Sequence, residues 1–159
     1  FLGVPGRLER IGQQSVFVDY AHTPDALENV LASLRPLAKG QLKVVFGCGG
    51  DRDREKRPKM GSIAELYADE VFVTSDNPRT EKPGSIIKQI LAGMQRTKPV
   101  TVEEDRRLAI EMAMKGLQSE DVLLIAGKGH ENYQIIGEKK IEFSDQDVVQ
   151  LYQEQSNQN

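Results

Sequence analysis

The feature that most constrains the fold is a regular alternation of short apolar runs with longer segments of helical spacing. The first run, Ser15 to Tyr20, precedes a segment from Pro24 to Leu37 in which apolar residues recur every three or four positions. Thr23 suits the helix cap and Pro24 the first turn. The pattern continues with strands at 42–47, 70–74, near 99–102 and at 121–126, and with helices near 57–68, 83–95 and 104–117. Such alternation predicts a mainly parallel sheet covered by helices on both faces.

The last part of the chain departs from this alternation. Tyr133 to Ile136 and Lys140 to Phe143 flank Gly137-Glu138-Lys139, which predicts a hairpin before a final helix from about Asp145. The predicted fold class is therefore α/β: a Rossmann-like three-layer αβα domain whose mainly parallel sheet carries an antiparallel edge hairpin near the C-terminus.

Length and composition predict one domain. With 159 residues and 38% apolar content, the chain can build a sizeable core. We expect residues 1–154 to form this domain and 155–159 to fray, and the apolar start at Phe1 suggests a piece cut from a longer protein. The sequence contains neither an apolar run of membrane-spanning length nor a signal-peptide pattern, so we expect a cytoplasmic protein that contacts no membrane and is monomeric.

The charge pattern points to a small ligand. A net charge of -3 argues against a nucleic-acid partner. Residues 52–59 nevertheless hold five basic side chains against two acidic ones, which indicates a local site for an anion.

Polar residues follow three of the expected strands. They are Thr74 to Arg79 after residues 71–73, Gly47 to Asp53 after residues 44–46, and Gly127 to Glu131 after residues 122–125. Open α/β sheets bind ligands at the carboxyl ends of their strands, so we expect the three loops to converge on a site for a small zwitterion or phosphate.

Individual residues in these loops have both ligand-binding and structural interpretations. Arg79 has the geometry of a carboxylate clamp that Pro78 stiffens, and Glu131 can accept an ammonium group, although Arg79 can equally be an ordinary surface arginine. Asp19 and His22 face either a nucleotide's ribose or base, or hydrogen-bond the chain itself.

Several kinds of site are excluded by the sequence. The pair Gly49-Gly50 belongs to neither the dinucleotide fingerprint nor a phosphate loop ending in Gly-Lys-Ser or Gly-Lys-Thr, and by itself it fits a tight turn with solvated charges. Cys48 is the only cysteine, which excludes an internal disulfide, and in this Gly-rich turn we interpret it as small filler. Two histidines cannot build a three-histidine metal site, so we expect no metal ligands, and we assign no catalytic residue.

Five motifs, in order, resemble the C-terminal domain of the Mur ligases, and in particular the members that add diaminopimelate. The resemblance runs from about residue 4 to residue 148. It rests on Pro5 to Glu9, Asp19 to Asp25, Phe46 to Pro58, Asp76 to Arg79 and Gly127 to Gln134.

The resemblance implies an amino-acid site. In such family members the Asp-Asn-Pro-Arg motif recognises meso-diaminopimelate, whereas members that add L-lysine typically lack its arginine. The implied ligand contacts are Asp76, Asn77, Pro78 and Arg79, completed by Arg52, Gly127 and Glu131. Diaminopimelate carries a second carboxylate that lysine lacks, which makes Arg79 the implied specificity determinant.

The resemblance also implies ATP-dependent amide-bond formation. Arg7, Asp19 and His22 are implied to face ATP when the domains of the whole enzyme close. The family forms an acyl phosphate on the D-glutamyl side chain of UDP-MurNAc-L-Ala-D-Glu, which the diaminopimelate amine then attacks. ATP and Mg²⁺ are bound mainly by a central domain, and the uridine nucleotide by an N-terminal domain, that this sequence does not contain, so we expect the chain alone to be inactive.

Two other interpretations remain open. A folylpolyglutamate synthetase-like ligase domain shares the implied fold and chemistry, although Asp-Asn-Pro-Arg together with Gly-Lys-Gly-His-Glu favours the cell-wall ligases. A non-catalytic module that binds a nucleotide or amino acid and regulates a partner is the interpretation outside the enzymes.

Overall fold

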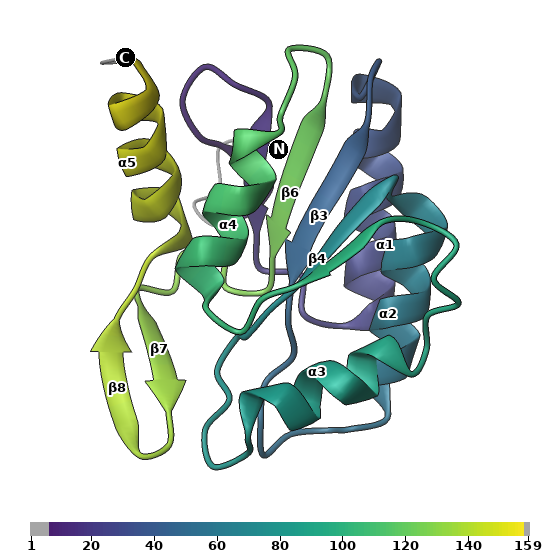
Figure 1. Ribbon diagram of the computed structural model, residues 1–159, viewed down its shortest axis with the longest axis vertical. Coiled ribbons are helices and arrows are strands. Elements are labelled where there is room, and N and C mark those ends of the chain that lie inside the picture. The colour runs from purple at the N-terminus through teal and green to yellow at the C-terminus, as the bar shows by residue number, and fades with distance from the viewer. Residues whose placement is uncertain (1–6, 158–159) are drawn as a thin grey trace.

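The computed structural model describes residues 7–157, which form one six-stranded sheet between two layers of helices (Figure 1). In spatial order the strands are β1 (Glu9–Arg10), β2 (Val16–Asp19), β6 (Val122–Ala126), β3 (Leu42–Phe46), β4 (Glu70–Val73) and β5 (Val100–Val102). All neighbours pair in parallel except β1 and β2, which are antiparallel. The carboxyl ends of β2, β6, β3 and β4 therefore lie side by side.

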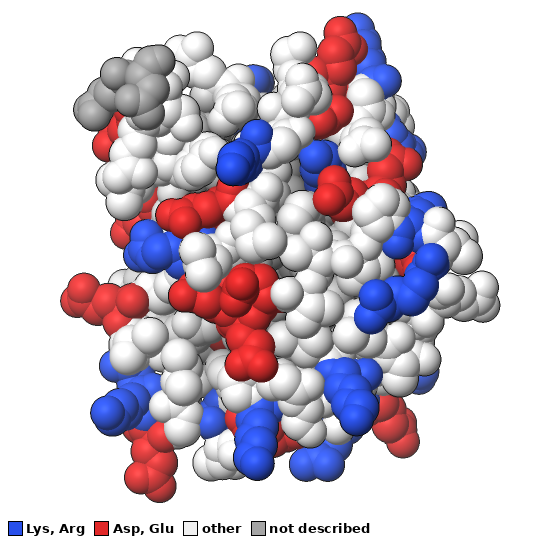
Figure 2. Space-filling view, in the orientation of Figure 1, with Lys and Arg blue, Asp and Glu red and all other residues white. Residues whose placement is uncertain are grey.

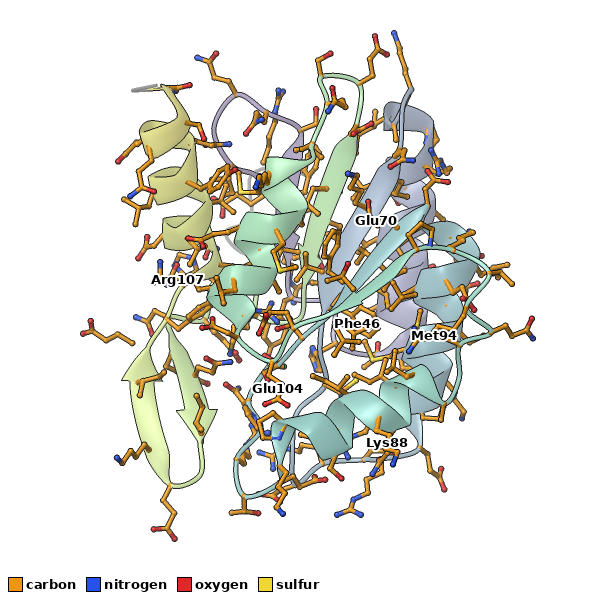
Figure 3. All side chains as sticks on the ribbon, viewed as in Figure 1. Phe46, Glu70, Lys88, Met94, Glu104 and Arg107 are labelled. Atoms are coloured by element: carbon orange, nitrogen blue, oxygen red, sulfur yellow. The ribbon has the colours of Figure 1, made fainter. Side chains whose placement is uncertain are left out.

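Helices cover both faces of the sheet. One face packs against α1 (Pro24–Leu34), α2 (Lys56–Tyr67) and α3 (Pro83–Leu91), and the other against α4 (Arg106–Lys115) and α5 (Asp145–Asn157). Successive strand residues face opposite layers, so Phe46 belongs to the first core and Val45 to the second. Figure 3 shows Phe46 and Met94 pointing into the space between the sheet and the first helical layer, where both are buried.

The ends of the helices have local causes. Thr23 accepts a hydrogen bond from the Ala26 amide at the start of α1, and Asp105 accepts one from the Leu108 amide at the start of α4. The helix expected over 24–37 ends at Leu34 and continues as a 3₁₀ turn, η1 (Arg35–Leu37), because Pro36 has no amide to donate. The helices expected over 83–95 and 104–117 are shorter than predicted, and Gly116 forms the cap of the second.

The hairpin is antiparallel as predicted, but it forms a two-stranded sheet of its own. It consists of β7 (Tyr133–Ile136) and β8 (Lys139–Glu142). It follows β6, whose two sides are already occupied by β2 and β3, so the chain has to leave the main sheet before it can turn. The antiparallel strand at the sheet edge is instead the short β1, which the sequence did not predict.

The α/β class and the mainly parallel sheet are confirmed. The tail expected to fray from residue 155 continues α5 as far as Asn157, and residues 158 and 159, like Pro5 and Gly6 of the first motif, lie outside the described residues. In the described part of the chain, every helix is too short or too polar to cross a membrane. Figure 2 shows acidic and basic side chains interspersed on the visible face, with several acidic groups gathered near its centre.

Candidate functional site

The loops that follow β3, β4 and β6 meet at the carboxyl edge of the sheet. The Gly50 amide donates to the Asn77 carbonyl at 2.8 Å, which joins the first loop to the second. The Lys128 ammonium donates to the Asn77 side-chain oxygen at 2.8 Å, which joins the second loop to the third. The sequence prediction that three polar loops converge is therefore confirmed by direct contacts.

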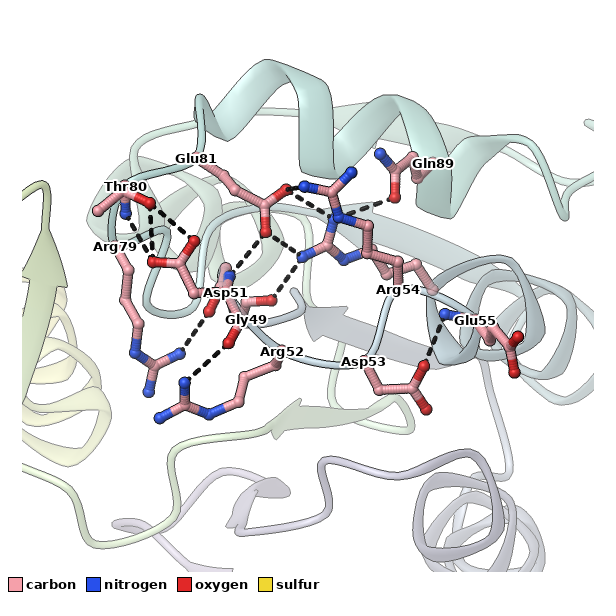
Figure 4. Close-up of polar contacts among 12 residues, drawn as sticks. Gly49, Asp51, Arg52, Asp53, Arg54, Glu55, Arg79, Thr80, Glu81 and Gln89 are labelled. Atoms are coloured by element: carbon pink, nitrogen blue, oxygen red, sulfur yellow. Dashed lines mark hydrogen bonds and ion pairs between the residues drawn. The ribbon is translucent and has the colours of Figure 1, made fainter.

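The loops after β3 and β4 are fastened together by side chains (Figure 4). The Asp51 carboxylate accepts hydrogen bonds from the Thr80 amide and hydroxyl, and the Asp51 amide donates to Glu81 at 2.7 Å. Asp51 has a left-handed backbone (φ 55°), which these contacts hold in place. Glycine is required at position 50 because a Cβ there would lie 1.8 Å from the Pro78 carbonyl oxygen.

A buried ion pair lies beneath this junction. The Arg57 side chain is fully buried, and its guanidinium group donates to both carboxylate oxygens of Glu81 and to the Gly49 carbonyl at 2.8 Å. Hydrogen bonding to Arg57 lowers the pKa of Glu81 to about 2. In the sequence Arg57 is only one member of a basic run, because nothing in its spacing shows that its side chain turns inward.

Two further arginines lie at the open side of the fastened loops. Figure 4 shows the guanidinium groups of Arg52 and Arg79 near each other, pointing away from the Glu81 junction. Each donates one hydrogen bond to a loop carbonyl, Arg52 to Asp51 and Arg79 to Gly50, at 2.8 and 2.9 Å. Within residues 7–157 neither forms an ion pair with a carboxylate, so most of their donors remain available to an anion.

The backbone of Arg79 is fixed by the hairpin. Its amide donates to the Ile135 carbonyl at 3.0 Å, and its carbonyl accepts from the Gly137 amide at 2.6 Å. Arg79 has a positive φ of 53°, a conformation that a non-glycine residue adopts only when neighbouring contacts enforce it. The hairpin that left the main sheet therefore serves to orient this arginine.

Acidic and amide groups form the other end of the site. Asp76 and Asn77 are buried, Glu131 is half-buried, and all three contact the buried Lys128. Burial raises the pKa of Glu131, and the nearby Lys128 ammonium counteracts this effect. Lys128 belongs to the last sequence motif, but nothing in the sequence pattern indicates a role for it.

Two predicted residues act through the backbone in this structure. Pro78 is buried against Gly50. Gly127 has a φ of 119°, which a side chain would strain, and its amide donates to the Asp19 carbonyl at 3.0 Å.

Tyr133 on β7 interacts electrostatically with both charged ends. The Glu131 carboxylate raises the pKa of its phenol, whereas Arg79 acts to lower it. The same electrostatic neighbourhood thus contains a cationic end, Arg52 and Arg79, and an anionic end, Asp76 and Glu131. A ligand that fits both ends has at least one carboxylate and one ammonium group.

A further buried ion pair supports the edge from below. Arg106 and Asp145 have fully buried side chains and share two hydrogen bonds of 2.8 Å. The Arg106 guanidinium also donates to the carbonyl of Ser75, two residues after β4, and to that of Ala126, the last residue of β6. No signal in the sequence distinguishes this arginine from its exposed neighbour Arg107.

Of the residues expected to face ATP, His22 lies in the loop after β2, Asp19 is the last residue of β2, and Arg7 precedes β1. Arg7 and His22 are exposed, and they line a pocket of about 410 Å³ whose wall includes Asp19, Tyr20 and residues of α1. Both oxygens of the buried Asp19 carboxylate accept backbone hydrogen bonds, from the Leu8 and Ala21 amides, each at 2.7 Å. Asp19 therefore holds the segment that carries Arg7.

A second pocket connects the two regions. It measures about 400 Å³ and is lined by Arg7, Tyr20, Lys128, His130, Glu131, Asn132 and Tyr133. Cys48 takes no part in it: the thiol is buried, and burial raises its pKa to about 12, so it stays protonated packing material. Among residues 7–157, no group of three or more His, Cys, Asp or Glu side chains is placed to hold a metal ion.

Comparisons with known proteins point in one direction. A protein family described as Mur ligase, glutamate ligase domain, matches residues 6–129. The UDP-N-acetylmuramoyl-L-alanyl-D-glutamate--2,6-diaminopimelate ligase of Synechococcus elongatus is 57% identical over 95% of this chain, which covers 31% of that relative. The ligase of the same name from Trichormus variabilis is 57% identical over 92% of the chain, again covering 31% of the relative.

Solved structures give the same picture. A structure titled as a UDP-N-acetylmuramoyl-L-alanyl-D-glutamate--2,6-diaminopimelate ligase superposes with a TM-score of 0.92 at 43% identity, over 99% of this chain and 33% of the other. A folylpolyglutamate synthase/dihydrofolate synthase from Yersinia pestis reaches a TM-score of 0.62 at 19% identity, over 79% of this chain and 28% of the other, which shows a shared fold only. The chain spans about one third of the length of the curated relatives it matches.

Proposed function

The chain belongs to the Mur ligase family, and on that premise we propose that it is the C-terminal, amino-acid-binding domain of an ATP-dependent ligase. The ligase adds meso-diaminopimelate to UDP-MurNAc-L-Ala-D-Glu during peptidoglycan precursor synthesis. We propose residues 1–154 as this domain and a cytoplasmic, monomeric parent enzyme with two further domains. ATP, Mg²⁺ and the uridine nucleotide are bound mainly by those domains.

The observation that carries the proposal is the separation of charge across one site. Arg52 and Arg79 form a cationic end whose donors lack a carboxylate partner in the described chain, and Asp76 with Glu131 forms an anionic end. In our assignment, Arg79 and Arg52 bind the distal carboxylate of diaminopimelate, while Asp76 and Glu131 bind an ammonium group. Asn77, Pro78 and Gly127 shape the loops between them.

The same geometry explains a preference over lysine. Diaminopimelate has an ammonium and a carboxylate group at each end of its chain. Lysine has only the ammonium group at its side-chain end and lacks the second carboxylate. Binding lysine would leave the desolvated Arg79 unpaired, at a cost of roughly 1 to 3 kcal/mol, or about 5-fold to 150-fold in affinity.

The contribution of this domain to the reaction is positioning. An acyl phosphate formed elsewhere in the ligase is attacked by the amine that this site holds, and phosphate leaves as the amide bond forms. Holding the amine in line with the acyl carbon replaces a bimolecular encounter, and closure of the domains excludes water. Arg7 and His22 face ATP in this arrangement, and Asp19 holds the segment that presents Arg7.

The decisive experiment is ligation by the full-length parent enzyme. It is supplied with UDP-MurNAc-L-Ala-D-Glu and ATP, and with meso-diaminopimelate or L-lysine in separate reactions. We expect a kcat/KM for diaminopimelate about 5-fold to 150-fold above that for lysine. A preference for lysine would keep the ligase and overturn the amino-acid site. Ligation of neither would favour the folate-like enzyme or the regulatory binding module.

A further inference from the structure

Lys128 follows β6 directly after Gly127, and it lies at the centre of the anionic end of the site. Its side chain is fully buried. The ammonium group donates to the Asn77 side-chain oxygen at 2.8 Å and to the Tyr133 carbonyl at 3.0 Å, and it lies 3.1 Å from Asp76 Oδ1 and 3.6 Å from Glu131 Oε1. Its partners come from the loop after β4, from its own loop and from β7.

This arrangement surrounds the Lys128 ammonium with protein oxygens. Two of its three N–H groups donate to Asn77 and Tyr133, and the ammonium forms an ion pair with Asp76 Oδ1 at 3.1 Å. A contact with the substrate would compete with these interactions. Lys128 therefore acts through its neighbours.

The ammonium also balances two carboxylates that share one site. Without it, Asp76 and Glu131 would repel each other, and the pKa of Glu131, which Lys128 acts to lower, would rise further. With it, the three groups together carry one net negative charge, which matches a single ammonium group on an amino acid. The Asn77 side-chain oxygen, held by Lys128 and by the Ile135 amide at 3.0 Å, fixes the amide so that its NH₂ group points away from both.

We propose that Lys128 is a positioning residue for amino-acid binding, which orients Asp76, Asn77 and Glu131 and offsets one of the two carboxylate charges without touching the amino acid. This inference rests on the proposed function, since it assigns the site its amino-acid ligand. It extends that function by naming the group that sets the charge of the ammonium-binding end.

The inference predicts a pH dependence that a lysine important only for folding would not produce. The charged and titratable groups facing Glu131 are Lys128 on its own loop, Asp76 after β4, Arg106 on α4, His22 after β2 and Tyr133 on β7, with Arg7, Tyr20 and His130 along the same pocket. Removing only the Lys128 charge shifts carboxylate protonation upward in pH. His22 and the other groups are shared with the wild type, so the difference between the two profiles isolates Lys128.

The test is Lys128→Met in the full-length ligase, with KM measured for each substrate between pH 6 and 8.5. We expect KM for diaminopimelate to rise about 30-fold at pH 7 and to fall again as the pH increases, while KM for ATP changes less than about threefold. The wild-type KM for diaminopimelate should stay level across this range. Equal effects on all three substrates, or a level profile in the variant, would overturn the inference.

The chain offers a matched control in Lys43. This second buried lysine pairs with Glu70 at 3.3 Å and donates to the Gly116 carbonyl at 3.2 Å, near the amino end of β3 and away from the site. Lys43→Met should lower stability but leave KM for diaminopimelate within about twofold at every pH. If Lys43→Met reproduces the Lys128→Met profile, the effect comes from folding and the inference is wrong.

A second variant decides the matter if Lys128→Met does not fold. Lys128→Arg keeps the charge but replaces a compact ammonium by a planar fork, so we expect KM for diaminopimelate to rise about fivefold or more with a level pH profile. An unchanged KM in this variant would contradict the positioning role. Failure of the proposed function is recognised separately, because it would appear in the wild type as ligation of lysine or of neither amino acid.

Discussion

The loop after β2 and the joined loops after β3 and β4 lie at the same edge of one sheet, but different interactions hold them in place. The first is fixed by one buried carboxylate, Asp19, whose oxygens accept two backbone hydrogen bonds. The second is fixed by a buried ion pair, Arg57 with Glu81, beneath side chains that remain exposed or half-buried. Both oxygens of Asp19 accept backbone hydrogen bonds, so this carboxylate fixes the chain rather than a ligand. The buried Arg57–Glu81 pair instead fixes the loops from beneath, which leaves the charged groups of Arg52 and Arg79 available to a ligand.

The largest effect should follow from breaking the ion pair. Glu81→Gln leaves the fully buried Arg57 guanidinium without its countercharge, so we expect the free energy of unfolding to fall by about 3 kcal/mol at pH 7. The loop that carries Arg79 should also loosen, which raises KM for diaminopimelate. Urea unfolding of the chain measures the first effect, and ligation by the parent enzyme measures the second.

The same pair predicts a sensitivity to acid. The pKa of Glu81 is lowered to about 2 from an ordinary value of 4.5, chiefly by hydrogen bonding to Arg57. Its stabilisation is fully present above pH 4.5 and is lost as the pH falls from there towards 2. Glu81→Gln should lack this part of the acid dependence, and Glu138→Gln, an exposed change in the hairpin turn, should keep it. An identical acid profile in the Glu81→Gln variant and the wild type would contradict the role of the pair.

The second prediction separates binding from stability in the joined loops. Arg79→Ala removes the half-buried guanidinium that we assign to the distal carboxylate, so KM for diaminopimelate should rise roughly 100-fold while KM for ATP stays within about threefold. Arg79→Lys keeps the positive charge but loses the planar guanidinium that binds a carboxylate through two hydrogen bonds. Its KM for diaminopimelate should therefore lie between those of the wild type and Arg79→Ala. Equal increases in both KM values would point to a defect in folding or domain closure.

The third prediction concerns the loop after β2, where we expect a substitution to lower stability without weakening diaminopimelate binding. Asp19→Ala leaves the Leu8 and Ala21 amides without their acceptor, so the free energy of unfolding should fall by about 2 kcal/mol. KM for diaminopimelate should change little, because Asp19 lies in the other pocket. Asp19→Asn retains one acceptor oxygen, so its free energy of unfolding, measured with urea, should fall by less than that of Asp19→Ala. A large rise in the diaminopimelate KM with unchanged stability would remove the distinction between the two regions.

Most of the strands and helices were predictable from the sequence because they are signalled by patterns among residues close together in the chain. Apolar runs and helical spacing located the strands and helices, and strand ends located the polar loops at one edge. The position of the hairpin was not local information. It depended on β6 being flanked on both sides by β2 and β3, which are far from it in sequence.

The candidate site shows the same limit at the level of single residues. Arg79 and Glu131 stood out because their types and loop positions match a zwitterion, and their ligand roles stay predictions. Lys128, Arg57 and Arg106 are fully buried cations, and each has a partner far away in sequence: Asn77 at 51 residues, Glu81 at 24 and Asp145 at 39. Sequence spacing cannot show which charged side chains turn inward, since that depends on carboxylates and carbonyls brought together only by the fold.

The smallest effect is expected at His22, and it sharpens the contrast within the loop after β2. His22 is exposed. Within the described residues, its imidazole contacts only Tyr20: Nδ1 lies 2.8 Å from the Tyr20 carbonyl oxygen, and the two ring centroids lie 4.6 Å apart in an edge-on arrangement. His22→Ala should therefore alter the free energy of unfolding by no more than about 0.5 kcal/mol. If His22 faces ATP, as we propose, KM for ATP should rise about threefold while KM for diaminopimelate stays unchanged, because an exposed contact contributes little binding energy. An unchanged KM for ATP would restrict the nucleotide-facing role to Arg7. A loss of stability as large as that of Asp19→Ala would show that the whole loop, rather than one carboxylate, holds this part of the chain.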